Sequence, residues 1–139
     1  MVITSQITLH TKGNGDIVDI TREVAEAVAV SEITNGTVTV FIAGSTAGVT
    51  TVEYEPGLVA DLQSLWERIS PRDIDYQHDR RWHDGNGHSH VRASLLGASL
   101  VVPFQSKQLI LGTWQQIIVV DFDNRSRSRQ VILQIIGEI

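Results

Sequence analysis

Cysteine is absent from this chain of 139 residues. Its absence excludes disulfides, thiolate metal ligands and a cysteine nucleophile, so any zinc site must use histidine and carboxylate side chains. Long apolar runs are missing too, and no stretch approaches the ~20 consecutive apolar residues of a membrane helix. Residues 1–10 alternate apolar and polar types and do not form a signal peptide. We therefore expect a single domain over residues 1–139 that is soluble, cytoplasmic and not bound to a membrane.

Positive charge is scarce, since 11 lysines and arginines face 16 aspartates and glutamates, giving a net charge of −5. Such a chain is not expected to bind nucleic acid, because that affinity rests on neutralising phosphates. The arginines nevertheless gather in two groups, Arg80, Arg81 and Arg92 around a histidine-rich segment and Arg125, Arg127 and Arg129 near the C-terminus. Local basic sites in an acidic protein favour a small anionic ligand.

The first part of the chain predicts two strands and a helix. Residues 2–11 alternate apolar and polar side chains, which is the period of a strand. A glycine-rich turn follows, and residues 16–20 are expected to return as the second strand of a hairpin. Thr21 is expected to cap a helix that ends at Asn35-Gly36. The clearest amphipathic helix begins at Glu55-Pro56-Gly57.

Six further strands are expected, over residues 37–43, 49–54, 97–103, 108–112, 115–121 and 129–136. The last four are expected to pair as two hairpins. Residues 72–87 are polar without periodicity, and residues 89–96 are compatible with a short helix. Strands occur in blocks and do not alternate with helices. This order predicts an α+β fold with a mostly antiparallel sheet and two main helices packed on one face.

The histidine segment, residues 78–90, contains four of the five histidines, namely His78, His83, His88 and His90. In an extended chain His88 and His90 would lie on one face and could share a metal ion, with His78 or Asp84 completing the site. In a helix these two side chains would diverge, and His90 would act alone. Gly85-Asn86-Gly87 would allow the backbone to approach a ligand. The alternative is a solvated, histidine-rich loop.

Four other positions are candidates for binding or catalysis. The hydroxyls of Ser45 and Thr46 lie in a run of small residues that is expected to form either a phosphate-binding nest or a simple turn. Glu53 follows a strand and is a candidate general base, although an exposed glutamate is commoner. Trp114 is a candidate for stacking on a heterocycle, although core or subunit interface is the usual place of such a residue.

Arg125, Arg127 and Arg129 alternate, so they share one face of an extended chain. One of them is expected to bind a phosphate group, and we choose Arg129 for this role. Asn86 is a further candidate for substrate binding. The other two arginines are expected to be solvated.

Two runs in the second half of the chain form a specific pattern. They are His88-Ser89-His90-Val91-Arg92-Ala93-Ser94-Leu95-Leu96-Gly97 and Leu109-Ile110-Leu111-Gly112-Thr113-Trp114-Gln115, with Pro103 between them. This pattern resembles the YjbQ-like family, small bacterial and archaeal proteins that are often labelled secondary thiamine-phosphate synthase. The resemblance extends over nearly the whole chain.

The resemblance implies an α+β fold, a homotrimer and a pocket near the subunit interfaces. It implies a divalent metal ion, zinc first and magnesium or manganese as alternatives, held by His78, His88 and His90. It also implies the joining of a pyrimidine diphosphate to a thiazole phosphate. One position departs from the family pattern: many members have Pro-His-Thr-Ser-Ala where this chain has Ala43-Gly44-Ser45-Thr46-Ala47.

Three functional hypotheses follow. The first is a thiamine-phosphate-synthase-like transferase at the histidine segment, with Ser45, Thr46 and Arg129 holding phosphates. The second is a metal-dependent hydrolase of a small phosphate ester, in which Asp84 or Glu53 activates a metal-bound water. The third is a non-catalytic trimeric module that binds a small phosphorylated metabolite.

Overall fold

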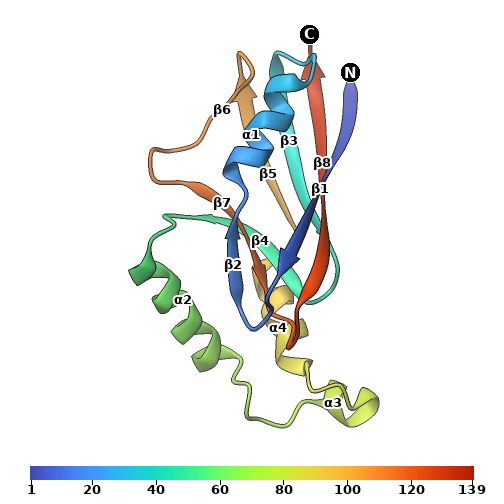
Figure 1. Cartoon of the computed structure of the whole chain (residues 1–139), viewed down its shortest axis with the longest axis vertical. Helices are drawn as coiled ribbons and strands as arrows, with labels where there is room; N and C mark the ends of the chain where they lie inside the picture. Colours follow the sequence, from blue (N-terminus) through green and yellow to red (C-terminus); the bar gives the residue numbers. More distant parts are fainter.

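The computed structural model describes residues 1–139 as eight strands and four helices. In chain order they are β1 (Val2–Thr11), β2 (Asp16–Asp19), α1 (Thr21–Val30), β3 (Asn35–Ala43), β4 (Ala47–Val52), α2 (Pro56–Ile69), α3 (Gln77–Trp82), α4 (Gly87–Leu96), β5 (Ser99–Gln105), β6 (Gln108–Leu109), β7 (Gln116–Asp121) and β8 (Arg127–Glu138). Both chain ends lie at one end of the molecule, and α3 and α4 lie at the other (Figure 1). None of the helices is both long and apolar enough to cross a membrane.

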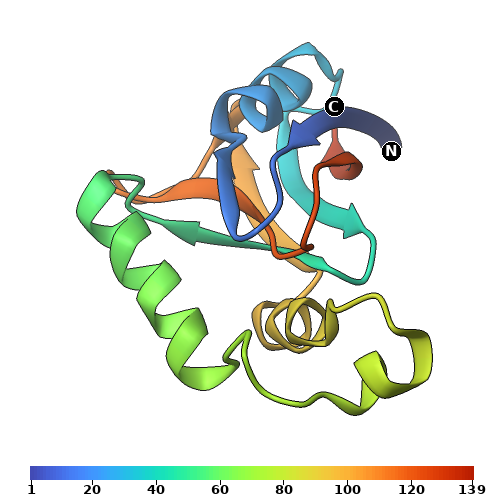
Figure 2. The ribbon, with the colours of Figure 1, turned by 60° about the horizontal axis from the view of Figure 1, so that its bottom comes forward.

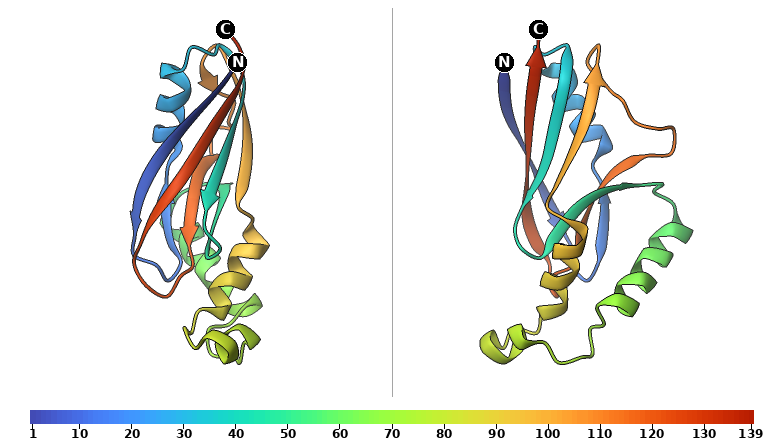
Figure 3. Two further views of the ribbon diagram at one scale, coloured as in Figure 1. Left: turned by 90° about the vertical axis from the view of Figure 1, so that its right-hand side faces the viewer. Right: turned by 180° about the vertical axis from the view of Figure 1, so that it is seen from behind.

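The strands form two antiparallel sheets, and the α+β class is confirmed. The larger sheet has the order β1-β8-β3-β5-β6, and the smaller has the order β2-β7-β4. Helix α1 lies on one face of the larger sheet (Figure 3). Helices α2 and α4 pack on the face of the smaller sheet that points away from α1, and α3 lies beside α4 (Figure 2).

Two expected hairpins are wrong. Strand β1 does not pair with β2, and β7 does not pair with β8. Instead β1 pairs with β8 and β2 pairs with β7. The turn after β1 explains the exchange, because the N–H groups of Asn14 and Gly15 donate to the carbonyls of Asp123 and Asp121, at 2.6 and 2.7 Å. The β1–β2 turn and the β7–β8 connection each run from one sheet to the other, side by side. Each strand therefore pairs with a segment that is distant in sequence.

Strand β7 holds the two sides of the protein together because both of its faces are buried. Ile117 and Val119 enter the main core, which lies between the two sheets and α1. The alternate residues, Ile118 and Val120, enter a second cluster together with Trp66 of α2. A strand buried on both faces has a continuous apolar sequence, as found here. The strand therefore fixes the position of the polar residues that follow it.

The helix boundaries differ from expectation at α1 and agree at α2. Thr21 is not a cap, because its hydroxyl donates to Asp19 and accepts the N–H of Ile117. Helix α1 ends at Val30, earlier than the expected end at Asn35-Gly36, because the backbone is already extended at Ser31. Helix α2 begins at Pro56, as expected, and the carboxylate of Glu55 caps it by accepting the N–H of Gly57 and Leu58.

Candidate functional site

A buried ion pair lies where β7 ends. Asp121 is fully buried, and its carboxylate accepts two hydrogen bonds from Arg129 of β8, from Nε and Nη2, each at 2.8 Å. The hydroxyl of Thr11, at the end of β1, donates to the same carboxylate. This bidentate geometry holds the guanidinium in one orientation.

A second buried carboxylate, Asp123, continues the network. The hydroxyl of Thr46 accepts a hydrogen bond from Arg129 Nη2 at 2.6 Å and donates to Asp123 at 3.0 Å. Asp123 also accepts Arg127 Nε at 2.9 Å and the amide of Asn86 at 3.4 Å. We call Thr11, Thr46, Asp121, Asp123, Arg127 and Arg129 the Asp–Arg network.

Both carboxylates of this network are charged at neutral pH. Burial acts to raise the pKa of Asp121, but the hydrogen bonds from Arg129 and Thr11 outweigh it, so the pKa lies below its ordinary value. Burial acts in the same way on Asp123, and the hydrogen bonds from the Asn124 N–H and from Thr46 again lower the pKa. Two negative charges therefore balance the two arginines.

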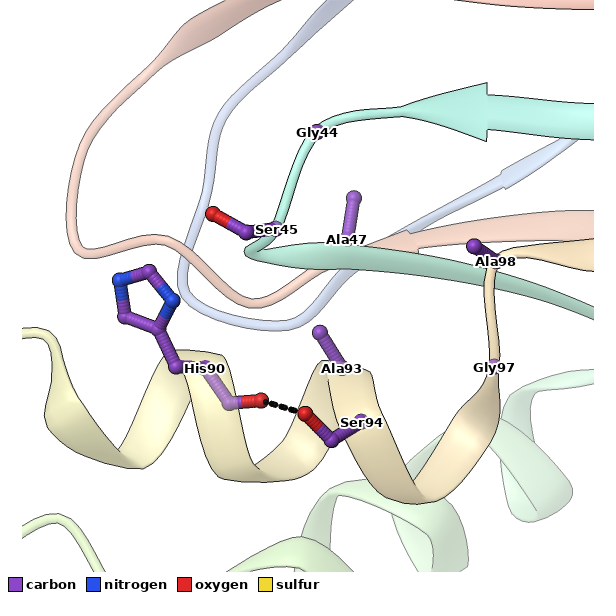
Figure 4. Close-up of a pocket in the computed structure, with 8 residues that line it drawn as sticks. All are labelled: Gly44, Ser45, Ala47, His90, Ala93, Ser94, Gly97 and Ala98. Carbon is purple, nitrogen blue, oxygen red and sulfur yellow. Dashed lines mark hydrogen bonds between the residues drawn. The ribbon is translucent and has the colours of Figure 1, made fainter.

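The Asp–Arg network forms one wall of a polar pocket of about 310 Å³. Its lining has no hydrophobic residue and consists of Gly44, Ser45, Thr46, Asp84, Asn86, His90, Asp123, Arg127 and Arg129. A neighbouring hollow of about 270 Å³ shares Gly44, Ser45 and His90 with it and continues along the small residues of α4. In Figure 4 the His90 ring projects from α4 toward the chain that carries Ser45. We call these two joined spaces the Arg129 pocket.

Gly44 leaves room for Arg129 at the pocket wall. A Cβ atom at Gly44 would lie 2.6 Å from Arg129 Nη1, which is closer than real contacts allow. The guanidinium cannot move aside freely, because Asp121 and Thr46 hold its other nitrogens. The guanidinium thus occupies the space that a side chain at position 44 would take.

The histidine segment does not form the expected metal site. His88 and His90 lie in the helix α4, where residues two apart point about 200° apart. His88 is buried, whereas His90 faces the pocket. No three histidine or carboxylate side chains converge with the geometry of a metal site. The metal site predicted from His78, His88 and His90 is therefore not supported, whereas binding of a divalent metal elsewhere stays a prediction.

The remaining histidines have separate environments. The His78 ring lies against the His90 ring at a tilt of 49°, with centroids 4.3 Å apart, and its Nε2 lies 3.3 Å from Asp84 and 3.1 Å from the Asn86 side-chain oxygen. His83 ends α3 in a left-handed conformation. Burial, and then the neighbouring His78, lower the pKa of His90, so its imidazole is neutral near pH 7. Burial and the charges of Arg92 and Arg72 lower the pKa of His88.

Among the other candidate residues, the structure brings some together and leaves others apart. Ser45, Asp84, Asn86 and Arg129 line the Arg129 pocket. Thr46 also lines it, but its hydroxyl is already engaged within the network. Glu53 and Trp114 are exposed and line none of the cavities. Their predicted catalytic and stacking roles have no support in this geometry.

Sequence reasoning missed Asp121 and Asp123 and treated Arg127 as a solvated residue. The available signal was the pair of aspartates directly after a fully apolar strand. Charged residues in that position are obliged to find buried partners.

Comparison with known proteins gives a consistent set of matches. The family model described as UPF0047 protein YjbQ-like matches residues 5–138. A UPF0047 protein of Archaeoglobus fulgidus is 39% identical over 129 residues, covering 93% of this chain and 98% of that protein. A UPF0047 protein of Methanothermobacter thermautotrophicus is 35% identical, covering 99% of this chain and 94% of that protein.

Solved structures agree with the sequence matches. A crystal structure of a YbjQ-like protein of unknown function from Sulfolobus solfataricus has a TM-score of 0.94 and 33% identity, covering 99% of both chains. A hypothetical protein from Aeropyrum pernix has a TM-score of 0.90 and 31% identity, covering 98% of this chain and 99% of that one.

These matches overturn the expected activity. The matched relatives are named only as UPF0047 proteins, and the Sulfolobus structure is described as a protein of unknown function. Nothing in them indicates thiamine-phosphate synthesis, and the side chains do not form the metal site which that hypothesis required. The predicted transferase at a His-rich metal site is therefore wrong. The metal-dependent hydrolase required the same ligands and loses its support with them.

Proposed function

Because the chain belongs to the UPF0047 (YjbQ-like) family, whose matched relatives have no stated activity, we propose a function from the geometry of the Arg129 pocket. This pocket binds a small phosphorylated metabolite. The phosphate group lies against the guanidinium of Arg129, beside Ser45 and His90.

The guanidinium of Arg129 is fixed in position and still has one free N–H donor. Arg129 Nε and Nη2 are used by Asp121 and Thr46. Nη1 has no hydrogen-bond partner in the protein, and it is not sealed from solvent, since Trp66 Nε1 is the only buried side-chain donor without a partner. A donor already held in place loses little conformational entropy when a ligand binds.

The charge of the lining indicates which ligands are favoured. Arg127 and Arg129 face three carboxylates, those of Asp84 and Asp123 in the lining and that of Asp121 directly behind them. The pocket therefore has no excess positive charge to attract a polyanion. Recognition rests on directed hydrogen bonds, so we expect weak affinity for free phosphate. The small-residue hollow along α4 would hold the rest of the metabolite.

We also propose that the protein assembles as a homotrimer. Support comes from apolar side chains on the outer face of the larger sheet, where Phe41, Val101 and Ile136 are exposed. The expected mass in light scattering is about three times 15.3 kDa. A mass of one chain at the concentrations used for binding would contradict this proposal.

Thermal unfolding with phosphorylated ligands tests the proposed binding. The ligand panel would contain inorganic phosphate, sugar phosphates and nucleoside monophosphates, each sugar or nucleoside also in unphosphorylated form. A ligand at about ten times its Kd stabilises the folded protein by roughly 1.4 kcal/mol. We expect stabilisation only by phosphorylated members, with inorganic phosphate the weakest.

Matched variants inside and outside the Arg129 pocket test where the ligand binds. Ser45→Ala and His90→Gln are expected to weaken it about fivefold to tenfold, the worth of one hydrogen bond. Ser64→Ala on α2 and His83→Gln at the end of α3 remove the same groups outside the pocket and should leave affinity unchanged. Equal effects of His90→Gln and His83→Gln, or no stabilisation by any phosphorylated ligand, would contradict the proposal.

A further inference from the structure

A second cavity, of about 190 Å³, lies between α2 and the turn that joins β1 to β2. It shares no lining residue with the Arg129 pocket. Its wall combines Gln63, Trp66 and Glu67 of α2 with Arg72, Arg92 and the 14–15 turn. The proposed function makes no use of any of these residues.

Arg92 gives this cavity a buried charged donor. Its side chain is 4% exposed, although it carries a full positive charge. Nε donates to the carbonyl of Ser70 at 3.0 Å, and Nη2 donates to Glu67 at 2.8 Å. Nη1 has no hydrogen-bond partner in the protein and is not sealed from solvent. Of the four cavities in the protein, Arg92 lines only this one, so its free N–H is available there.

Trp66 provides a second, independent sign of a ligand. Its indole Nε1 is the only buried side-chain nitrogen or oxygen without a hydrogen-bond partner. The ring itself is well packed, edge-on against Phe122 with centroids 5.0 Å apart. A buried donor left without a partner is costly and rare in folded proteins. Nε1 is out of reach of solvent in this conformation, so an acceptor in the cavity that Trp66 lines would reach it after a small movement of the indole.

The charges of the lining favour an anion as that acceptor. Arg72 and Arg92 outnumber the single carboxylate, Glu67. The Glu67 carboxylate is already engaged by Arg92 and by the backbone N–H of Arg72, whereas the Arg72 guanidinium has no partner. Gln63 adds a further donor at the rim. The Arg129 pocket has no such excess of positive charge.

We infer that this cavity binds a compact oxyanion, a phosphate or sulfate group, between Arg92, Arg72 and Trp66. A water molecule takes about 30 Å³ of liquid volume. The cavity therefore has room for a tetrahedral oxyanion with a few waters, and it is too small for a nucleotide. The inference is independent of the ligand proposed for the Arg129 pocket.

The indole N–H of Trp66 is the reporter for the test. In a Trp82→Phe, Trp114→Phe background, Trp66 is the only tryptophan, and the two replaced residues are exposed. Inorganic sulfate, phosphate and chloride would be titrated at constant ionic strength while the indole ¹H–¹⁵N resonance is recorded. We expect a saturable shift with sulfate and phosphate and none with chloride.

Arg72→Gln tests whether the shift comes from this cavity, because Arg72 is exposed and its loss should not disturb folding. It should weaken binding about fivefold. Arg68→Gln on α2 removes the same charge outside the cavity and should change nothing. Ser45→Ala should also leave the shift intact, which separates this cavity from the Arg129 pocket. No saturable shift, or equal weakening by Arg72→Gln and Arg68→Gln, would overturn the inference.

Discussion

The histidine segment and the Asp–Arg network differ in how sequence relates to space. Residues 78–90 are close in sequence, yet His88 is buried, His90 faces the pocket and His83 ends α3. The members of the Asp–Arg network come from β1, the β3–β4 connection and the segment from β7 to β8, yet they form one continuous set of hydrogen bonds.

In this fold, polar side chains converge where strands end and diverge along the helix α4. A helix turns each successive side chain by about 100°, so neighbouring histidines in α4 cannot share a ligand. Strand ends converge at one edge of the sheets, so distant residues such as Thr46 and Asp123 meet there. Clustering along the sequence is therefore weaker evidence than a charged pair directly after a buried strand.

The largest expected effect is the loss of the buried ion pair. Asp121→Asn leaves the Arg129 guanidinium without its charged partner in a buried site. Breaking such a pair typically costs about 3–5 kcal/mol of unfolding free energy. Urea unfolding measures it, with Asp61→Asn on the exposed side of α2 as the control. A cost within about 0.5 kcal/mol, the usual range for a surface substitution, would show that the network is not a structural centre.

A smaller effect is expected from filling the space beside Arg129. Gly44→Ala places a methyl group against Nη1, at a residue with φ of +146° that also disfavours side chains. We expect a loss of about 1–3 kcal/mol in unfolding free energy and weaker binding in the Arg129 pocket. Gly15→Ala provides the comparison, because φ is +84° but no atom lies within 4 Å of the new Cβ. Equal phosphate affinity in the two variants would show that Nη1 does not contact the bound phosphate.

The smallest effect concerns the buried histidine. The pKa of His88 is lowered below the ordinary value of 6.5 by burial and by Arg92. The unfolded chain therefore binds more protons than the folded protein between the lowered pKa and pH 6.5. The free energy of unfolding is therefore highest, as far as His88 determines it, above pH 6.5. It decreases as the pH falls from 6.5 toward the pKa of His88 in the folded protein.

His88→Gln should flatten this part of the stability–pH curve, measured by urea unfolding at a series of pH values. His10→Gln removes an exposed imidazole from β1 and should leave the slope as it was. If both variants keep the wild-type slope, His88 does not control it.

Local patterns predicted much of the fold and only part of the site. The apolar run before Asp121 and the Glu55-Pro56 start of α2 are local signals, and both are confirmed. The exchange of β1–β2 and β7–β8 for β1–β8 and β2–β7 is not local, because it depends on hydrogen bonds between the 14–15 turn and Asp121 and Asp123.

The same distinction explains the candidate site. Ser45, Asn86 and Arg129 were identified by their chemical type, and they do line one pocket. The partners that fix Arg129 belong to distant segments, and no short motif contains them. Glu53 and Trp114 had suitable side chains but lie away from that edge of the sheets, which residue type alone does not predict.

A crystal structure of the protein with the most strongly stabilising phosphorylated ligand at saturation would show directly whether the phosphate group binds in the Arg129 pocket. We predict a phosphate oxygen within hydrogen-bond distance of Arg129 Nη1, with Ser45 and His90 beside it and the Asp121–Arg129 pair unchanged. A ligand bound at His83 or elsewhere along the histidine segment, with the Arg129 pocket empty, would contradict the account.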